Sequence, residues 1–109
     1  MNIIDNMPDD LSEELIETLL EKDNLRIERI VSRGHVSSEW YDQDSDEFVL
    51  LVQGEAKLLF EQGNREVYLR AGDYIFIPAH ERHKVTWTPP TSNTIWFAVH
   101  YGDQNYNIT

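Results

Sequence analysis

From residue 25 to residue 101 the chain alternates between short runs of strand-forming residues and turn residues. The strongest run is EFVLLVQ at 47–53, which follows an acidic loop and ends at Gly54. A nearly continuous apolar run of this length is typical of a strand that is buried on both faces. The other runs lie at 25–30, 35–40, 56–61, 65–70, 74–77, 83–88 and 94–101. Many short strands at such turn-punctuated spacing predict an all-β sandwich or barrel.

The N-terminal part of the chain has a different pattern. Its apolar residues recur at helical spacing, and Pro8 with the acids that follow suits the start of a helix. The apolar residues concerned are Leu11, Leu15, Ile16, Leu19 and Leu20. We therefore expect one amphipathic α-helix over about residues 9–22. The expected organisation is a leader and helix at 1–24, a barrel at 25–102 and a loose tail at 103–109.

Composition restricts the partners and the chemistry of the chain. The 109 residues carry 20 acidic and 9 basic side chains, a net charge of −11 that repels nucleic acid. The absence of cysteine excludes disulfides, thiolate metal sites and thiol nucleophiles. No signal-peptide pattern and no apolar run of about 20 residues is present, so we expect a cytoplasmic protein without a membrane partner.

Two stretches carry glycine and polar residues at a fixed spacing. The first contains Gly34, Glu47 and Gly54, with six residues between the last two. The second, GDYIFIPAHERHKV, begins at Gly72 and contains His83. These stretches resemble the two signature motifs of the cupin superfamily, and the chain is similar to small single-domain, RmlC-like members. The resemblance covers about residues 25–101 and implies a jelly-roll barrel, or double-stranded β-helix, with the expected helix outside it.

The chain departs from the family pattern at the first motif. The two histidines of that motif are missing, and their positions correspond either to Trp40 and Asp42 or to Tyr41 and Gln43. In the second motif His80 replaces a glycine and Trp87 replaces an asparagine. In metal-binding members, the motif histidines and the glutamate hold one divalent ion.

The resemblance implies a metal site at Glu47 and His83, with Asp42 or Gln43 supplying an oxygen ligand. Such an oxygen-rich set favours manganese, iron or zinc. The alternative for Glu47 is a carboxylate that pairs with an arginine or caps a loop. The alternative for His83 is a pocket histidine held by hydrogen bonds without metal.

Aromatic and imidazole side chains predict the lining of a pocket inside the barrel. Ordinary barrel core is the alternative for most of them. The expected lining residues are Trp40, Tyr41, Phe76, His80, Trp87, Trp96 and His100.

Three functions remain open from the sequence. The first is a metal-dependent oxygenase, isomerase or decarboxylase that acts on a small organic molecule. The second is a non-catalytic module that binds or senses a small ligand. The third is a metal-free acid–base enzyme with His83 as the base and Tyr74 as the acid. We also expect a homodimer, because the family often pairs its barrels.

Overall fold

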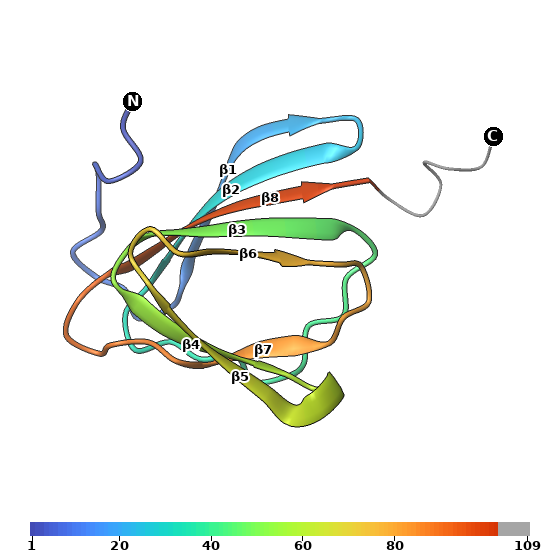
Figure 1. Cartoon of the computed structure of the whole chain (residues 1–109). Helices are drawn as coiled ribbons and strands as arrows, with labels where there is room; N and C mark the ends of the chain where they lie inside the picture. Colours follow the sequence, from blue (N-terminus) through green and yellow to red (C-terminus); the bar gives the residue numbers. More distant parts are fainter. Residues whose placement is uncertain (103–109) are drawn as a thin grey trace.

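Two antiparallel sheets face each other in the computed structural model, which describes residues 1–102 (Figure 1). One sheet has the strand order β1-β2-β8-β3-β6, and the other has the order β5-β4-β7. The strands are β1 (Leu15–Lys22), β2 (Leu25–Ser32), β3 (Asp46–Gln53), β4 (Glu55–Phe60), β5 (Arg65–Arg70), β6 (Tyr74–Ile77), β7 (His83–Trp87) and β8 (Thr94–Tyr101). A short 3-10 turn, η1 (Gln62–Asn64), joins β4 to β5. The tail expected at 103–109 lies outside the described residues.

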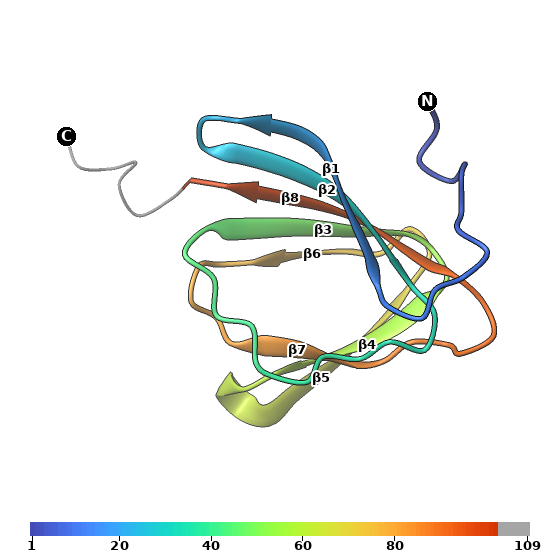
Figure 2. The same ribbon diagram turned by 180° about the vertical axis from the view of Figure 1, so that it is seen from behind.

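The all-β prediction is confirmed, and seven of the expected runs form strands within two residues of the expected bounds. The run at 35–40 forms no strand. Instead, the segment between β2 and β3 crosses beside β7, as Figure 2 shows from behind. It is held there by the amide of Ser37, which donates to the carbonyl of Val85 at 2.9 Å, and by a bridge between Tyr41 and His83. This segment therefore closes one side of the barrel.

The N-terminal α-helix predicted for residues 9–22 is wrong. Residues 15–22 form β1, which pairs with β2 along the edge of the larger sheet. A register shift between Thr18 and Leu20 interrupts the alternation of the strand. As a result, Ile16 lies opposite Ile30 while Leu20 lies opposite Ile27, so the two side chains point to different faces. The four-residue spacing that suggested a helical stripe is therefore accommodated by a bulged strand, in which Ile16 and Leu20 do not share a face.

The central strand β3 is buried on one face rather than on both. Glu47, Val49 and Leu51 are buried between the sheets, whereas Phe48 and Leu50 on the other face are half-buried. The inward residues belong to the main core, which is formed by Val49, Leu51, Ala56, Leu58, Phe60, Leu69, Ile77 and Trp96. Glu47 therefore occupies a position that the strand pattern would give to an apolar residue.

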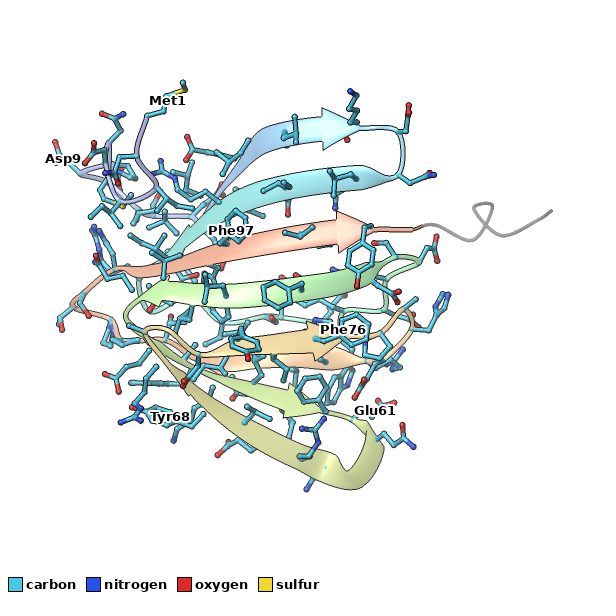
Figure 3. All side chains as sticks on the ribbon, turned by 45° about the horizontal axis from the view of Figure 1, so that its top comes forward. Met1, Asp9, Glu61, Tyr68, Phe76 and Phe97 are labelled. Atoms are coloured by element: carbon cyan, nitrogen blue, oxygen red, sulfur yellow. The ribbon has the colours of Figure 1, made fainter. Side chains whose placement is uncertain are left out.

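The outer face of the larger sheet carries aromatic side chains from three strands. Phe48 in β3 lies opposite Phe76 in β6, and its ring stacks on Tyr74 with the centroids 5.6 Å apart. Tyr74 and Phe76 are 68% and 49% exposed. Figure 3 looks toward this face and labels Phe76 and Phe97 on it. We refer to Phe48, Tyr74, Phe76, Phe97 and Tyr101 as the outer aromatic patch.

Two glycines with left-handed backbones allow a matched test of the fold. Gly54, between β3 and β4, has φ +91°, and a Cβ there would lie 2.7 Å from the carbonyl oxygen of Asn93. Gly72 has φ +94°, but a Cβ there would meet nothing within 4 Å. We expect Gly72→Ala to lower the free energy of unfolding by about 1 kcal/mol through backbone strain alone. Gly54→Ala should lower it by about 3 kcal/mol, because the strand ends must also move apart.

Urea unfolding of the two variants measures this difference. Equal losses in Gly54→Ala and Gly72→Ala would contradict the close contact between the β3–β4 turn and the start of β8.

Candidate functional site

Glu47 stands at the centre of the candidate site. It lies near the start of β3, opposite Ile77 of β6 and His100 of β8, and its side chain points between the sheets. Its side chain is 9% exposed. Among residues 1–102, none donates a hydrogen bond to the Glu47 carboxyl group. The carboxyl group faces the pocket instead, and two other lining residues contribute buried atoms without a hydrogen-bond partner in the described part of the chain, Nε of Arg26 and Nδ1 of His100. Such polar atoms are costly for the fold, which suggests a use outside folding.

His83 approaches Glu47 from the opposite sheet. It is the first residue of β7, and two backbone hydrogen bonds of 2.7 and 3.1 Å fix it to Tyr41. Its Nδ1 donates to the carbonyl oxygen of Glu81 at 2.9 Å, because a carbonyl can only accept. The neutral ring therefore carries its lone pair on Nε2, which lies 3.8 Å from Oε1 of Glu47.

His100 reaches the same carboxyl group from β8. Its Nε2 lies 3.8 Å from Oε2 of Glu47 and 3.0 Å from Oε1 of Glu28. The Glu28 carboxylate accepts the Nε2 proton at the shorter distance and also pairs with Arg26, whose Nε lies 3.1 Å away. Glu47 is consequently flanked by two imidazoles, of which His100 is engaged elsewhere and His83 presents a free lone pair.

The surroundings shift the pKa values of two of these groups. Burial, assisted by the nearby Glu28 carboxylate, raises the pKa of Glu47 from 4.5 to about 7, although Arg26 opposes the shift. Burial also lowers the pKa of His100, against the attraction of Glu28. Near neutral pH, Glu47 is therefore present in both protonation states, while His100 is neutral.

A pocket of about 240 Å³ opens over these groups. Its walls are mainly apolar, and β1 contributes Ile16 at one side. The polar lining consists of Glu14, Arg26, Glu28, Tyr41, Gln43, Glu47, His83 and His100. The volume suits a small organic molecule of roughly ten to twenty heavy atoms.

Six of the residues predicted for the site lie together in this pocket. They are Tyr41, Gln43, Glu47, His83, Trp96 and His100. Sequence reasoning missed Glu14, Arg26 and Glu28. The alternation of β2 places Arg26 and Glu28 on the same face as Ile30, which was the available signal, while Glu14 was hidden by the expected helix.

The remaining predicted site residues lie outside the pocket. Tyr74 and Phe76 point outward from β6, so Tyr74 is not placed to act as the acid. Trp87 lies opposite Lys57 rather than beside Leu58, because a register shift in β4–β7 turns it away from the direction of His83. Trp40 and Trp87 instead lie under the ammonium groups of Lys84 and Lys57.

Asp42 and His80 form a separate exposed pair. Oδ1 of Asp42 lies 2.8 Å from Nδ1 of His80, and Arg82 is 3.9 Å from the other carboxylate oxygen. Neither Asp42 nor His80 is among the residues that line the pocket. The predicted approach of Asp42 to Glu47 is therefore not found.

The assembled residues do not fit the metal site that the resemblance implied. Residues 1–102 contain no group of three or more His, Asp or Glu placed to hold an ion. Nε2 of His100 is engaged by Glu28, and Asp42 lies elsewhere. Of the predicted ligands, Glu47, His83 and Gln43 do line the pocket. They provide one carboxylate, one imidazole and one amide oxygen, which is less than the ligand set that the resemblance implied.

The raised pKa of Glu47 predicts how stability depends on pH. As pH rises from 4.5 to about 7, the unfolded chain releases this proton before the folded chain does, so stability falls through that range. The full cost above pH 7 is about 3 kcal/mol. We expect Glu47→Gln to remove this cost, so that its stability relative to the wild type grows by about that amount between pH 4.5 and pH 8.

Urea unfolding at several pH values measures the effect, with the exposed Glu66→Gln as the control for loss of one acid. A stability difference for Glu47→Gln that stays constant with pH would show that the Glu47 carboxyl group titrates normally.

Comparison with known proteins places this architecture in a family. The sequence profile of the Cupin domain family matches residues 28–100. A protein of Ralstonia eutropha JMP134, described as a proposed mannose-6-phosphate isomerase, is 39% identical, with a TM-score of 0.88 over 93% of this chain and 95% of that one. A cupin superfamily protein of Desulfitobacterium hafniense DCB-2 has a TM-score of 0.75 and 19% identity over 89% of this chain and 84% of its own.

A more distant likeness extends to an enzyme. The polyketide cyclase RemF of Streptomyces resistomycificus has a TM-score of 0.71 and 18% identity over 83% of this chain and 66% of its own. None of the proteins with curated functions matches the chain. The described residues also include no helix that is long and apolar enough to span a membrane. The match over residues 28–100, together with the two facing sheets, shows that the chain belongs to the cupin superfamily.

Proposed function

We propose that this cupin binds a small organic molecule in the pocket over Glu47 and moves a proton within it, as an isomerase does. The observation that carries the proposal is the convergence of His83 and Glu47 from opposite sheets. The lone pair of His83 Nε2 faces a buried carboxyl group at 3.8 Å inside a pocket of about 240 Å³. A base with a fixed tautomer, and a carboxylate beside it that stabilises the protonated base, are parts that proton transfer uses.

In the proposed reaction His83 is the base. Its Nε2 takes a proton from a carbon next to a carbonyl group, and the electron pair of that C–H bond moves onto the carbonyl oxygen as an enolate. The resulting imidazolium stands 3.8 Å from the Glu47 carboxylate. At that separation, the attraction between opposite unit charges is about 4 kcal/mol near a protein surface. In a substrate with a hydroxyl group on the deprotonated carbon, the proton of that hydroxyl moves to the enolate oxygen. Return of the proton held by His83 to the former carbonyl carbon then leaves the carbonyl group on the neighbouring carbon and completes an isomerisation.

Glu47 supports this step through its charge. Because its pKa lies at about 7, the carboxylate form becomes dominant just above neutral pH. On the other side of Glu47, Nε2 of His100 donates its proton to Glu28. His100 and Glu28 therefore do not compete with His83 for the proton of the substrate. The catalytic pair is therefore Glu47 and His83, while His100 and Glu28 are positioning residues.

The comparisons support the reaction class rather than the substrate. The Ralstonia eutropha relative is described as an isomerase, a class whose sugar reactions move a proton between adjacent carbons. The residues of the pocket do not favour the metal-dependent oxygenase or decarboxylase that the resemblance suggested, because the described residues include no group of three His, Asp or Glu placed to hold a metal ion. A non-catalytic binding module would use the same pocket, and the deuterium-exchange experiment below distinguishes it from an enzyme.

Deuterium exchange tests the proton transfer directly. The protein is incubated in D₂O with a panel of small hydroxy- and amino-carbonyl compounds, and loss of the C–H signal next to the carbonyl is followed by proton NMR. We expect exchange into at least one compound. His83→Ala and Glu47→Gln should each slow it by about 100-fold or more, the usual contribution of a general base.

His80→Asn is the matched control, because it removes an imidazole outside the pocket from a residue with φ +65°, which asparagine tolerates. It should leave exchange unchanged. If compounds bind but none exchanges, the pocket is a binding module. If exchange survives in His83→Ala, the assignment of the base is wrong.

We further propose that the outer aromatic patch joins two copies of the chain. Large exposed apolar patches on soluble proteins mark interaction sites, and this one lies on a regular sheet face that can repeat around a twofold axis. Tyr74 and Phe76 stand at its most exposed end.

Sedimentation velocity tests this interface. We expect twice the chain mass for the wild type and one chain mass for the double variant Tyr74→Asp/Phe76→Asp. Tyr68→Asp, at an exposed tyrosine of the other sheet, should remain dimeric. A wild type that sediments as a single chain at every concentration would exclude the dimer.

A further inference from the structure

The polar end of the pocket contains hydrogen-bond acceptors without matching donors. The carboxyl group of Glu47, nine-tenths buried, receives no hydrogen bond from any residue of 1–102. Nε2 of His83 presents a lone pair beside it, because Nδ1 carries the proton that binds Glu81. Both groups face the same space over the pocket. A ligand that satisfies the Glu47 carboxyl group must bring N–H or O–H groups of its own.

The basic side chains on the β2 and β8 side of the pocket face the Glu28 carboxylate. Arg26 is the one guanidinium in the lining, and its Nε lies 3.1 Å from the Glu28 carboxylate. The imidazole of His100 donates to the same carboxylate. Gln43 and Tyr41 can donate or accept, so they favour neither kind of ligand. Among the described residues, Nε of Arg26 makes no hydrogen bond despite its ion pair with Glu28, so the case against an anion rests on the charge of the lining rather than on a lack of donors.

The charge of the lining also favours a cation. Three carboxyl groups line the pocket, those of Glu14, Glu28 and Glu47, against the single guanidinium of Arg26. Glu28 is matched by Arg26. Within residues 1–102, the only basic groups beside Glu47 in the lining are the imidazoles of His83 and His100, each at 3.8 Å. Glu14 accepts a hydrogen bond of 2.6 Å from Ser32 Oγ, a neutral group. A phosphate or carboxylate would be repelled here, whereas a positive group would be attracted.

The remaining pocket walls are apolar and indicate the chemistry of the rest of the ligand. They are formed by aliphatic and aromatic side chains, which suit a hydrocarbon chain or ring rather than a polyol. These residues are Ile16, Ile30, Val49, Leu58, Ile77, Val85, Trp96 and Ala98. A molecule with a short apolar body and a cationic donor head would match both parts of the pocket.

We infer that the molecule bound in this pocket carries a primary ammonium group, which donates hydrogen bonds to the two oxygens of the Glu47 carboxylate and leaves Nε2 of His83 available as the base. This inference rests on the proposed function only in using the same pocket. An ammonium ligand also differs from the phosphorylated sugar that is named in the description of the Ralstonia eutropha relative. A primary ammonium has three donors and can satisfy both carboxylate oxygens at once, which a quaternary ammonium of equal charge cannot do.

Calorimetric titration at pH 8 with three small probes tests the inference, in buffer that contains EDTA so that metal ions cannot contribute. The probes are n-butylammonium, tetramethylammonium and n-butyl phosphate. We expect n-butylammonium to bind at least tenfold more tightly than tetramethylammonium, and n-butyl phosphate not to bind. Glu47→Gln should weaken n-butylammonium at least tenfold, whereas Glu66→Gln, which removes the same charge from the outer surface, should not.

The outcomes distinguish this inference from the proposed function. If n-butyl phosphate binds as well as n-butylammonium, or if Glu47→Gln leaves n-butylammonium binding unchanged, the ammonium assignment is overturned even if deuterium exchange occurs with another compound. If n-butylammonium binds through Glu47 and no compound exchanges deuterium, the ammonium assignment stands and the proton transfer fails. Equal binding of n-butylammonium and tetramethylammonium would overturn the role of the donated hydrogen bonds.

Discussion

The burial of the Glu47 carboxyl group between two facing sheets is the constraint on which the site depends. Its strand is otherwise apolar, and the neighbouring inward positions are Val49 and Leu51, both in the core. A carboxyl group at such a position would ordinarily be paired with a cation. Here the nearest groups are two imidazoles at 3.8 Å, and Arg26 is occupied by Glu28. The pKa of Glu47 therefore lies at about 7, so its carboxyl group changes charge within the pH range in which a proton-transfer site works.

The two sheets contribute unequal parts of this arrangement. The larger sheet supplies the carboxyl groups. Arg26 of β2 and Glu47 of β3 both lie opposite His100 of β8, and Glu28 lies two residues beyond Arg26 on the same face. The smaller sheet supplies His83, fixed through its backbone to Tyr41 and through Nδ1 to Glu81. The distance between acid and base is thus set by the packing of one sheet on the other.

Much of the fold could be predicted from the sequence, and the failures have identifiable causes. Strands such as Arg65–Arg70 and Thr94–Tyr101 were placed correctly because they alternate regularly between turn residues. In β1, a bulge interrupts the alternation, so its apolar residues have a spacing that also suits a helix. In β7, the register shift against β4 turns Trp87 to the outside. Bulges are set by strand pairing, which no local pattern records. Sequence spacing alone therefore could not say which face these residues occupy.

The site was partly predictable for a similar reason. Glu47 and His83 lie at motif positions, so their convergence followed from the family resemblance, whereas Glu28 depends on the register of β2 against β8. The missing motif histidines are a real change in chemistry, because the positions that could replace them contribute Tyr41 and Gln43 to the pocket while Trp40 and Asp42 lie outside it. An imidazole does return, as His100 from β8, but Glu28 takes its Nε2 proton. The pocket therefore keeps the family's carboxylate and one histidine, but the described residues do not bring a third histidine or acid into position to complete a metal site.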